Sequence, residues 1–181
     1  MSSSNSTFKI VIAYETDAIA IRAKDMAEEI VSELHSEFQS WEMDTLAEPE
    51  YLLHAAAAAS EADMIIVAAR GAGELPQHVK DWIDLWLPHK KDGPTALVVL
   101  LDEEGESLRR PPVYCAYLRR VAERGNMDFF CNASHWTLRD FAGAKEVMLD
   151  TTAQVSTGST ATPTTWWETE APDRNYAVLN R

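Results

Sequence analysis

The chain alternates short apolar runs with longer stretches in which apolar residues recur every three or four positions. The short runs are rich in β-branched residues, which is typical of strands that are buried on both faces of a parallel sheet. The longer stretches have the spacing of amphipathic helices that bury one side. The runs predicted as strands are residues 8–14, 37–43, 63–69, 95–101 and 127–131.

Helical spacing separates these runs. Proline ends or begins two of the predicted helices: Pro88 follows the third, and Pro111-Pro112 suits the first turn of the fourth, where a missing N–H has no partner to lose. Gly125-Asn126 is expected to end the fourth helix. The predicted helices cover residues 19–34, 50–62, 77–87 and 111–124, with a weaker pattern over 137–150.

The order of elements predicts the fold class. Strands that alternate with helices form parallel pairs, because each parallel crossover needs a helix and keeps one hand. We therefore expect an α/β fold: a three-layer, doubly wound, five-stranded parallel sheet in the order 2-1-3-4-5. The expected organisation is a disordered N-terminal tail (1–7), one domain (8–150) and an extended C-terminal arm (151–181) that ends in aromatic anchors.

The net charge of the chain limits the kinds of partner that it is expected to bind. The 181 residues include 16 Lys+Arg and 29 Asp+Glu, so the formal charge is −13, which repels phosphate backbones and anionic membranes. We expect no nucleic-acid partner and no membrane association. The N-terminal residues lack the pattern of a signal peptide, which predicts a cytoplasmic protein. The two cysteines do not form a disulfide framework.

In an open parallel sheet, ligands bind beyond the carboxyl ends of the strands, where the strand order reverses. For the order 2-1-3-4-5, that crevice lies between the first and third strands. We expect it to bring together residues 15–22, 70–76 and 102–110.

Three segments carry a resemblance to a known family. Residues 63–76 and 79–84 resemble the third strand, the flavin-contacting loop and the following helix of flavodoxins and of NAD(P)H-dependent FMN reductases, and residues 24–30 resemble the first flavodoxin helix. The resemblance covers residues 8 to about 131 and implies a flavodoxin-like fold that binds FMN for electron transfer or flavin-dependent reduction. The cofactor-binding residues that it implies are Thr16 and Arg22 at the phosphate, Arg70, Gly71, Gly73 and Glu74 at the ring, and Asp102 at the start of the third loop.

The first loop departs from the family pattern. Flavodoxins cradle the FMN phosphate with hydroxyls and glycines at a helix N-terminus, whereas here Thr16 stands between the carboxylates of Glu15 and Asp17. One interpretation is an FMN-dependent oxidoreductase or electron carrier with an unusual phosphate site. The other is a cofactor-free scaffold for interaction or assembly, in which Thr16 or Asp17 merely caps the first helix.

The two interpretations imply different partners. The acidic charge of a redox protein suits a basic partner protein. The C-terminal arm, with Trp166-Trp167 near its end, suits a homodimer or another assembly. Neither interpretation assigns a catalytic side chain.

The sequence gives little or no support to three other kinds of chemistry. Cys115, near the start of the fourth helix, is a weak candidate for a reactive thiol. The histidines show no metal-ligand spacing, so we expect no metal site. The third strand ends in Ala68-Ala69-Arg70 without an aspartate, which excludes a phosphoacceptor receiver domain.

Overall fold

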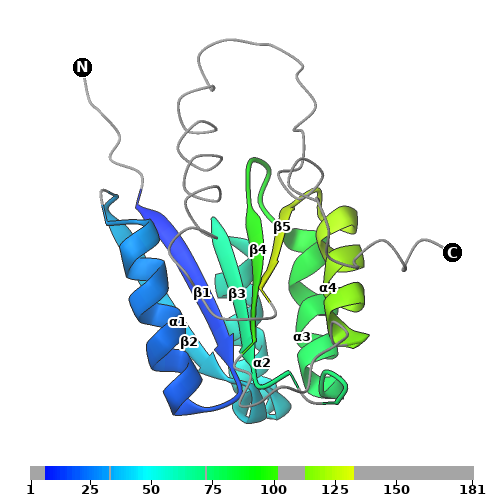
Figure 1. Cartoon of the computed structure of the whole chain (residues 1–181). Helices are drawn as coiled ribbons and strands as arrows, with labels where there is room; N and C mark the ends of the chain where they lie inside the picture. The colour runs from blue at the N-terminus through cyan, green and yellow to red at the C-terminus, as the bar shows by residue number, and fades with distance from the viewer. Residues whose placement is uncertain (1–6, 33, 72, 102–112, 133–181) are drawn as a thin grey trace, which may run out of the picture.

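Five parallel strands form one sheet in a computed structural model that describes residues 7–32, 34–71, 73–101 and 113–132. The strand order is β2-β1-β3-β4-β5, as the sequence predicts (Figure 1). This order makes the fold flavodoxin-like. The strands are β1 (Phe8–Tyr14), β2 (Ser36–Glu42), β3 (Met64–Ala69), β4 (Ala96–Leu101) and β5 (Asp128–Asn132).

The predicted helices that lie in the described part of the chain are confirmed. They are α1 (Asp17–Ile30), α2 (Pro49–Ser60), α3 (Gln77–Trp86) and α4 (Val113–Arg124). Asn126 adopts a left-handed conformation, with φ of 49°, just after α4, as expected of a residue that ends a helix. The sequence analysis missed the 3-10 helix η1 (Met43–Ala47), and a second one, η2 (Leu87–His89), follows α3 at Pro88.

The helices cover both faces of the sheet, which confirms the three-layer architecture (Figure 1). Helix α1 packs against one face, where Ile12, Ile66 and Leu100 are fully buried. Helices α2, α3 and α4 pack against the other face, and Trp82 and Trp86 of α3 meet there edge to face with ring centroids 5.9 Å apart. Strands β3 and β4 are buried at every position, as their unbroken apolar runs predict.

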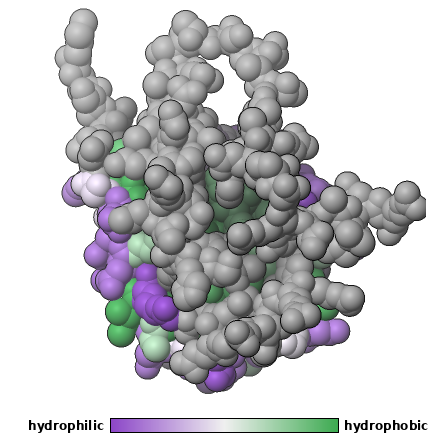
Figure 2. All heavy atoms as spheres, viewed as in Figure 1, coloured by the Kyte–Doolittle hydropathy of each residue, from purple (hydrophilic) through white to green (hydrophobic). Residues whose placement is uncertain are grey.

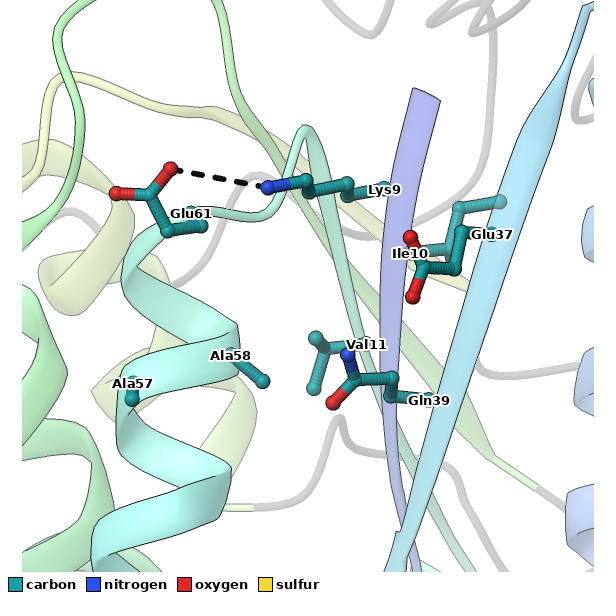
Figure 3. Close-up of a pocket in the computed structure, with 8 residues that line it drawn as sticks. All are labelled: Lys9, Ile10, Val11, Glu37, Gln39, Ala57, Ala58 and Glu61. Atoms are coloured by element: carbon teal, nitrogen blue, oxygen red, sulfur yellow. Dashed lines mark ion pairs between the residues drawn. The ribbon is translucent and has the colours of Figure 1, made fainter. Parts of the chain in front are cut away.

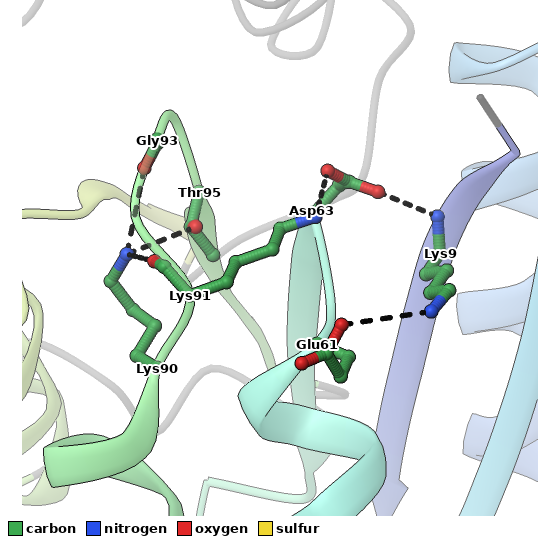
Figure 4. Close-up of polar contacts among 7 residues, drawn as sticks. All are labelled: Lys9, Glu61, Asp63, Lys90, Lys91, Gly93 and Thr95. Carbon is green, nitrogen blue, oxygen red and sulfur yellow. Dashed lines mark hydrogen bonds and ion pairs between the residues drawn. The ribbon is translucent and has the colours of Figure 1, made fainter. Parts of the chain in front are cut away.

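Polar contacts stabilise the sheet at the amino-terminal ends of its central strands (Figure 4). The Asp63 carboxylate, just before β3, accepts a hydrogen bond of 2.8 Å from the backbone N–H of Lys9 in β1 and one from the Lys91 ammonium. Lys91 lies in the segment that leads into β4, so a single carboxylate just before β3 links β1 to that segment. The neighbouring Glu61 forms a looser ion pair of 3.8 Å with the Lys9 ammonium.

The outer surface of α1 is charged. Its exposed positions include Arg22, Lys24, Asp25 and Glu28, and the flank of the molecule where α1 lies is mostly hydrophilic in Figure 2. Among the described residues, no helix has both the length and the apolar character needed to cross a membrane.

Several predictions fall outside the described residues. These are the N-terminal tail over most of its length, Asp102 and the rest of the third loop up to residue 110, the helix over 137–150, and the arm over 151–181.

Candidate functional site

The carboxyl ends of β1 and β3 meet where the strand order reverses. Tyr14, the last residue of β1, is in register with Ala68 of β3, and the next backbone N–H, that of Glu15, donates a 3.0 Å hydrogen bond to the Ala68 carbonyl. The loops after β1 and β3 therefore start side by side, as the topology predicts. We call these two loops, together with the first turn of α1, the switch-point site.

A carboxylate joins the two loops. Glu15 accepts a hydrogen bond of 2.7 Å from the backbone N–H of Arg70 and one of 2.8 Å from its guanidinium Nε. The Arg70 side chain is 62% exposed and that of Glu15 is 34% exposed, so solvent weakens the ion pair but does not remove its geometry. In the sequence Glu15 stands only as a carboxylate beside Thr16, but in the structure it is paired with Arg70.

Thr16 occupies the N-cap position of α1 without acting as a cap. Its backbone is extended, and its side chain makes no capping hydrogen bond. Thr16 is therefore the N-cap residue by position, as one interpretation of the sequence predicts, but its hydroxyl does not supply the capping hydrogen bond. Asp17 is the first residue of α1. Burial raises the pKa of Tyr14, and the charge of Asp17 raises it further.

Arg22 lies further along α1 than a phosphate site requires. A phosphate at the N-terminus of a helix is reached most directly from the first turn, whereas α1 begins at Asp17 and places Arg22 in its second turn on an exposed face. Its role at a phosphate remains a prediction.

The loop after β3 has the backbone that its glycines predict. Gly71 and Gly73 have φ values of 85° and 82°, in the region that disfavours any residue with a Cβ. A Cβ built on Gly73 would meet no described residue within 4 Å, so the backbone there faces open space. Glu74 forms a long ion pair of 3.9 Å with Lys80 of α3, and Leu75 is buried beneath the loop. A flat ligand can therefore approach this backbone closely.

Tyr114 at the start of α4 is a member of the site that the sequence analysis missed. The residue is only 4% exposed, and within the part of the chain that the structure describes its hydroxyl has no hydrogen-bond partner. Burial, followed by the charges of Cys115 and Glu15, raises the pKa of this hydroxyl, whereas the nearby backbone N–H of Gly71 opposes the rise. These influences place the Tyr114 hydroxyl beside the loop after β3. The sequence hides this placement because Tyr114 belongs to an ordinary apolar helix face.

Cys115 follows Tyr114 and is not an activated thiol. A hydrogen bond with Cys131, followed by burial, raises the pKa of Cys115, which is the opposite of the lowering expected near a helix N-terminus. The described residues contain no cluster of three or more His, Cys, Asp or Glu side chains that could hold a metal ion.

A cavity of about 240 Å³ lies elsewhere, near the amino ends of β1 and β2. Figure 3 shows Lys9 and Glu61 across its mouth, with Ala57 and Ala58 of α2 on one side and Gln39 on the other. Its lining combines the polar side chains of Lys9, Glu37, Gln39 and Glu61 with aliphatic ones, and it does not include any residue of the switch-point site.

Comparisons with known proteins give a likeness of fold. No protein-family model matches the chain, and no curated protein matches it. Among solved structures, an NAD(P)H:quinone oxidoreductase from Methanothermobacter marburgensis has a TM-score of 0.45 at 9% identity, over 86% of this chain and 100% of that one. The flavoenzyme NAD(P)H:(acceptor) oxidoreductase FerB from Paracoccus denitrificans has a TM-score of 0.45 at 13% identity, over 82% of this chain and 98% of that one.

An azoreductase from Bacillus anthracis str. Sterne has a TM-score of 0.41 at 14% identity, over 82% of this chain and 98% of the azoreductase. At such identities and TM-scores, no cofactor or activity transfers from these proteins to this chain. The fold assignment rests on the strand order of the chain itself.

Proposed function

We propose that the switch-point site binds FMN and that the protein is an FMN-dependent oxidoreductase or electron carrier. The observation that carries the proposal is the loop after β3 at the strand-order reversal, where Gly71 and Gly73 both have positive φ and the backbone at Gly73 is exposed. Backbone groups presented in this way suit the edge of an isoalloxazine ring. Arg70 and Glu74 flank this loop, and Asp102 follows β4, the next strand of the sheet.

The phosphate end of the site fits better than its sequence suggests. The Thr16 hydroxyl has no capping bond, so it is available to an anion at the N-terminus of α1, where the helix dipole favours negative charge. Arg70 offsets the charge of Glu15, which leaves Asp17 as the carboxylate that opposes a phosphate within residues 15–17. Arg22 is one helical turn away from the position that would serve best.

Bound FMN would supply the redox chemistry. The residues of the chain would position it: Thr16 would donate a hydrogen bond to phosphate, the loop at Gly71 and Gly73 would approach the ring edge, and the unpartnered Tyr114 hydroxyl would offer a further donor next to Gly71. An acidic protein of charge −13 would dock on a basic redox partner.

The first experiment is the visible absorption spectrum of the purified protein. The stripped protein is then titrated with FMN and, in parallel, with riboflavin, which has the same ring but no phosphate. Saturable quenching of flavin fluorescence by FMN supports the proposal. Indifference to both flavins would refute it.

The variant Thr16→Ala tests the phosphate contact. One hydrogen bond to a charged group contributes about 1.5–3 kcal/mol, so FMN affinity should fall roughly 10-fold to 100-fold. Riboflavin affinity should stay unchanged, because riboflavin lacks the phosphate. Folding stability should also stay nearly unchanged, because Thr16 makes no cap bond. Equal losses for both flavins would contradict the assignment.

A second candidate function is a cofactor-free scaffold for interaction or assembly. The hydrogen bonds from Arg70 to Glu15 favour it, because they tie the two loops together across the crevice that a flavin would enter. In this case the arm over 151–181 would join two copies of the chain or hold another partner. Deleting that arm and measuring the mass in solution tests the idea, and an unchanged mass with unchanged thermal stability would refute it.

A further inference from the structure

The two cysteines of the chain lie against each other, although 15 residues separate them in sequence. Cys115 is the third residue of α4 and Cys131 the fourth residue of β5, and their sulfur atoms are 3.0 Å apart. Both thiols are free. A disulfide bond is about 2.05 Å long, so the two sulfur atoms need to approach by only about 1 Å to form one.

The two thiols differ in environment. Cys115 is buried, with 6% of its surface exposed, whereas Cys131 is partly exposed. The hydrogen bond from Cys115 lowers the pKa of Cys131, with a further lowering from the charge of Arg119, against the effect of burial. Cys131, the more exposed of the two residues, is thus also the one whose thiol more readily becomes a thiolate, which is the reactive form.

We propose that Cys115 and Cys131 form a reversible intramolecular disulfide when the protein meets a small-molecule disulfide of the glutathione type. The disulfide would link α4 to β5, next to Tyr114 of the switch-point site. This modification site does not depend on whether the protein binds a flavin.

The reaction proceeds in two exchange steps. The Cys131 thiolate attacks one sulfur of glutathione disulfide, the bond between the two glutathione sulfurs breaks, and one glutathione thiolate leaves. Cys115 then loses its proton to solvent and attacks the Cys131 sulfur, which releases the second glutathione thiolate. The two protein sulfurs lose two electrons in total, and the two glutathione sulfurs gain them.

Intact-mass spectrometry of the full chain tests the proposal. The protein is incubated with glutathione disulfide, quenched with acid and N-ethylmaleimide, and measured without reduction. The chain has two cysteines, so the expected product is unambiguous: a monomer that has lost two hydrogens, carries neither glutathione nor maleimide, and regains both thiols with dithiothreitol. A protein that keeps both thiols, or that ends with glutathione on each, would overturn the proposal.

Two variants test the order of attack. Cys115→Ser should accumulate one glutathione on Cys131, because nothing resolves the mixed disulfide. Cys131→Ser should lose its remaining thiol at least tenfold more slowly than Cys115→Ser, because Cys115 is buried. Equal rates in the two variants would overturn the assignment of Cys131 as the attacking thiol. The wild-type mass decides the pairing whether or not the variants fold.

Discussion

Removing the carboxylate of Asp63 should destabilise the folded protein by breaking the contacts at the amino-terminal ends of β1 and β3. Asp63→Ala deletes the acceptor of the Lys9 backbone N–H and the partner of the Lys91 ammonium (Figure 4). It leaves both donors without their present partner at the point where β1, β3 and the segment before β4 converge. The matched control is Glu61→Ala, which removes a carboxylate two residues away.

The exposed fractions set the magnitude. The side chains of Asp63 and Lys91 are 23% and 29% exposed, so the contact is partly shielded, and two hydrogen bonds to a charged group give a loss of about 2–3 kcal/mol after discounting for solvent. Glu61 and Lys9 are 63% and 46% exposed and 3.8 Å apart, so Glu61→Ala should cost no more than about 0.5 kcal/mol.

Urea unfolding, followed by far-UV circular dichroism, measures both variants. We expect a lower midpoint at an unchanged m-value for Asp63→Ala and almost no shift for Glu61→Ala. Asp63→Asn should fall between them, because its amide oxygen can accept the Lys9 N–H but cannot balance the charge of Lys91. If Asp63→Ala and Glu61→Ala cost the same, the reasoning from burial and geometry is refuted.

Three further predictions concern single positions. Glu15→Gln removes the charge beside Thr16 and releases the Arg70 guanidinium, so FMN titration should show tighter binding, and weaker binding would contradict the proposed phosphate site. Burial raises the pKa of the Asp128 carboxyl above 3.8, so its charged form destabilises the folded protein at higher pH. Asp128→Asn should therefore raise the unfolding temperature at pH 7, and raise it less at pH 4. An equal rise at both pH values would contradict burial as the cause. Asn126→Ala should cost about 1 kcal/mol in urea unfolding because of the positive φ, whereas Asn126→Gly should cost less than about 0.5 kcal/mol; equal losses would count against strain.

Local patterns were enough to predict the fold. The apolar run of β1 and the fully buried runs of β3 and β4 give strands within one residue of their observed bounds, because burial on both faces leaves little room for polar residues. The helix η1 could not be predicted, because its five residues are too few for a periodic pattern. It is stabilised by the side-chain hydroxyl of Thr45, which donates a hydrogen bond to the Glu42 carbonyl.

The chemistry of the site was harder to predict, because it depends on contacts between distant residues. Glu15 was judged by its neighbours in sequence, but its partner Arg70 lies 55 residues further along the chain. Cys115 was judged by its place on a helix, but its pKa is governed by Cys131 on the next strand. In both cases one contact with a residue far away in the sequence changes the electrostatic behaviour that the local sequence predicts.

The strand order also has a consequence for the folding of the chain during its synthesis. Strand β1 can pair with β2 once residue 42 has been made. The other edge of β1 stays unpaired until β3 is complete at residue 69. The free edge of β3 then stays unpaired until β4 is complete at residue 101. Until then a growing chain presents an open, strongly apolar strand edge, the kind of surface that pairs with other chains. Closing these long loops before the pairing stabilises them also makes folding slow. By the same reasoning the free edge of β4 waits for β5, which ends at residue 132, so the aggregation risk of this protein falls mainly on the period before β5 is complete.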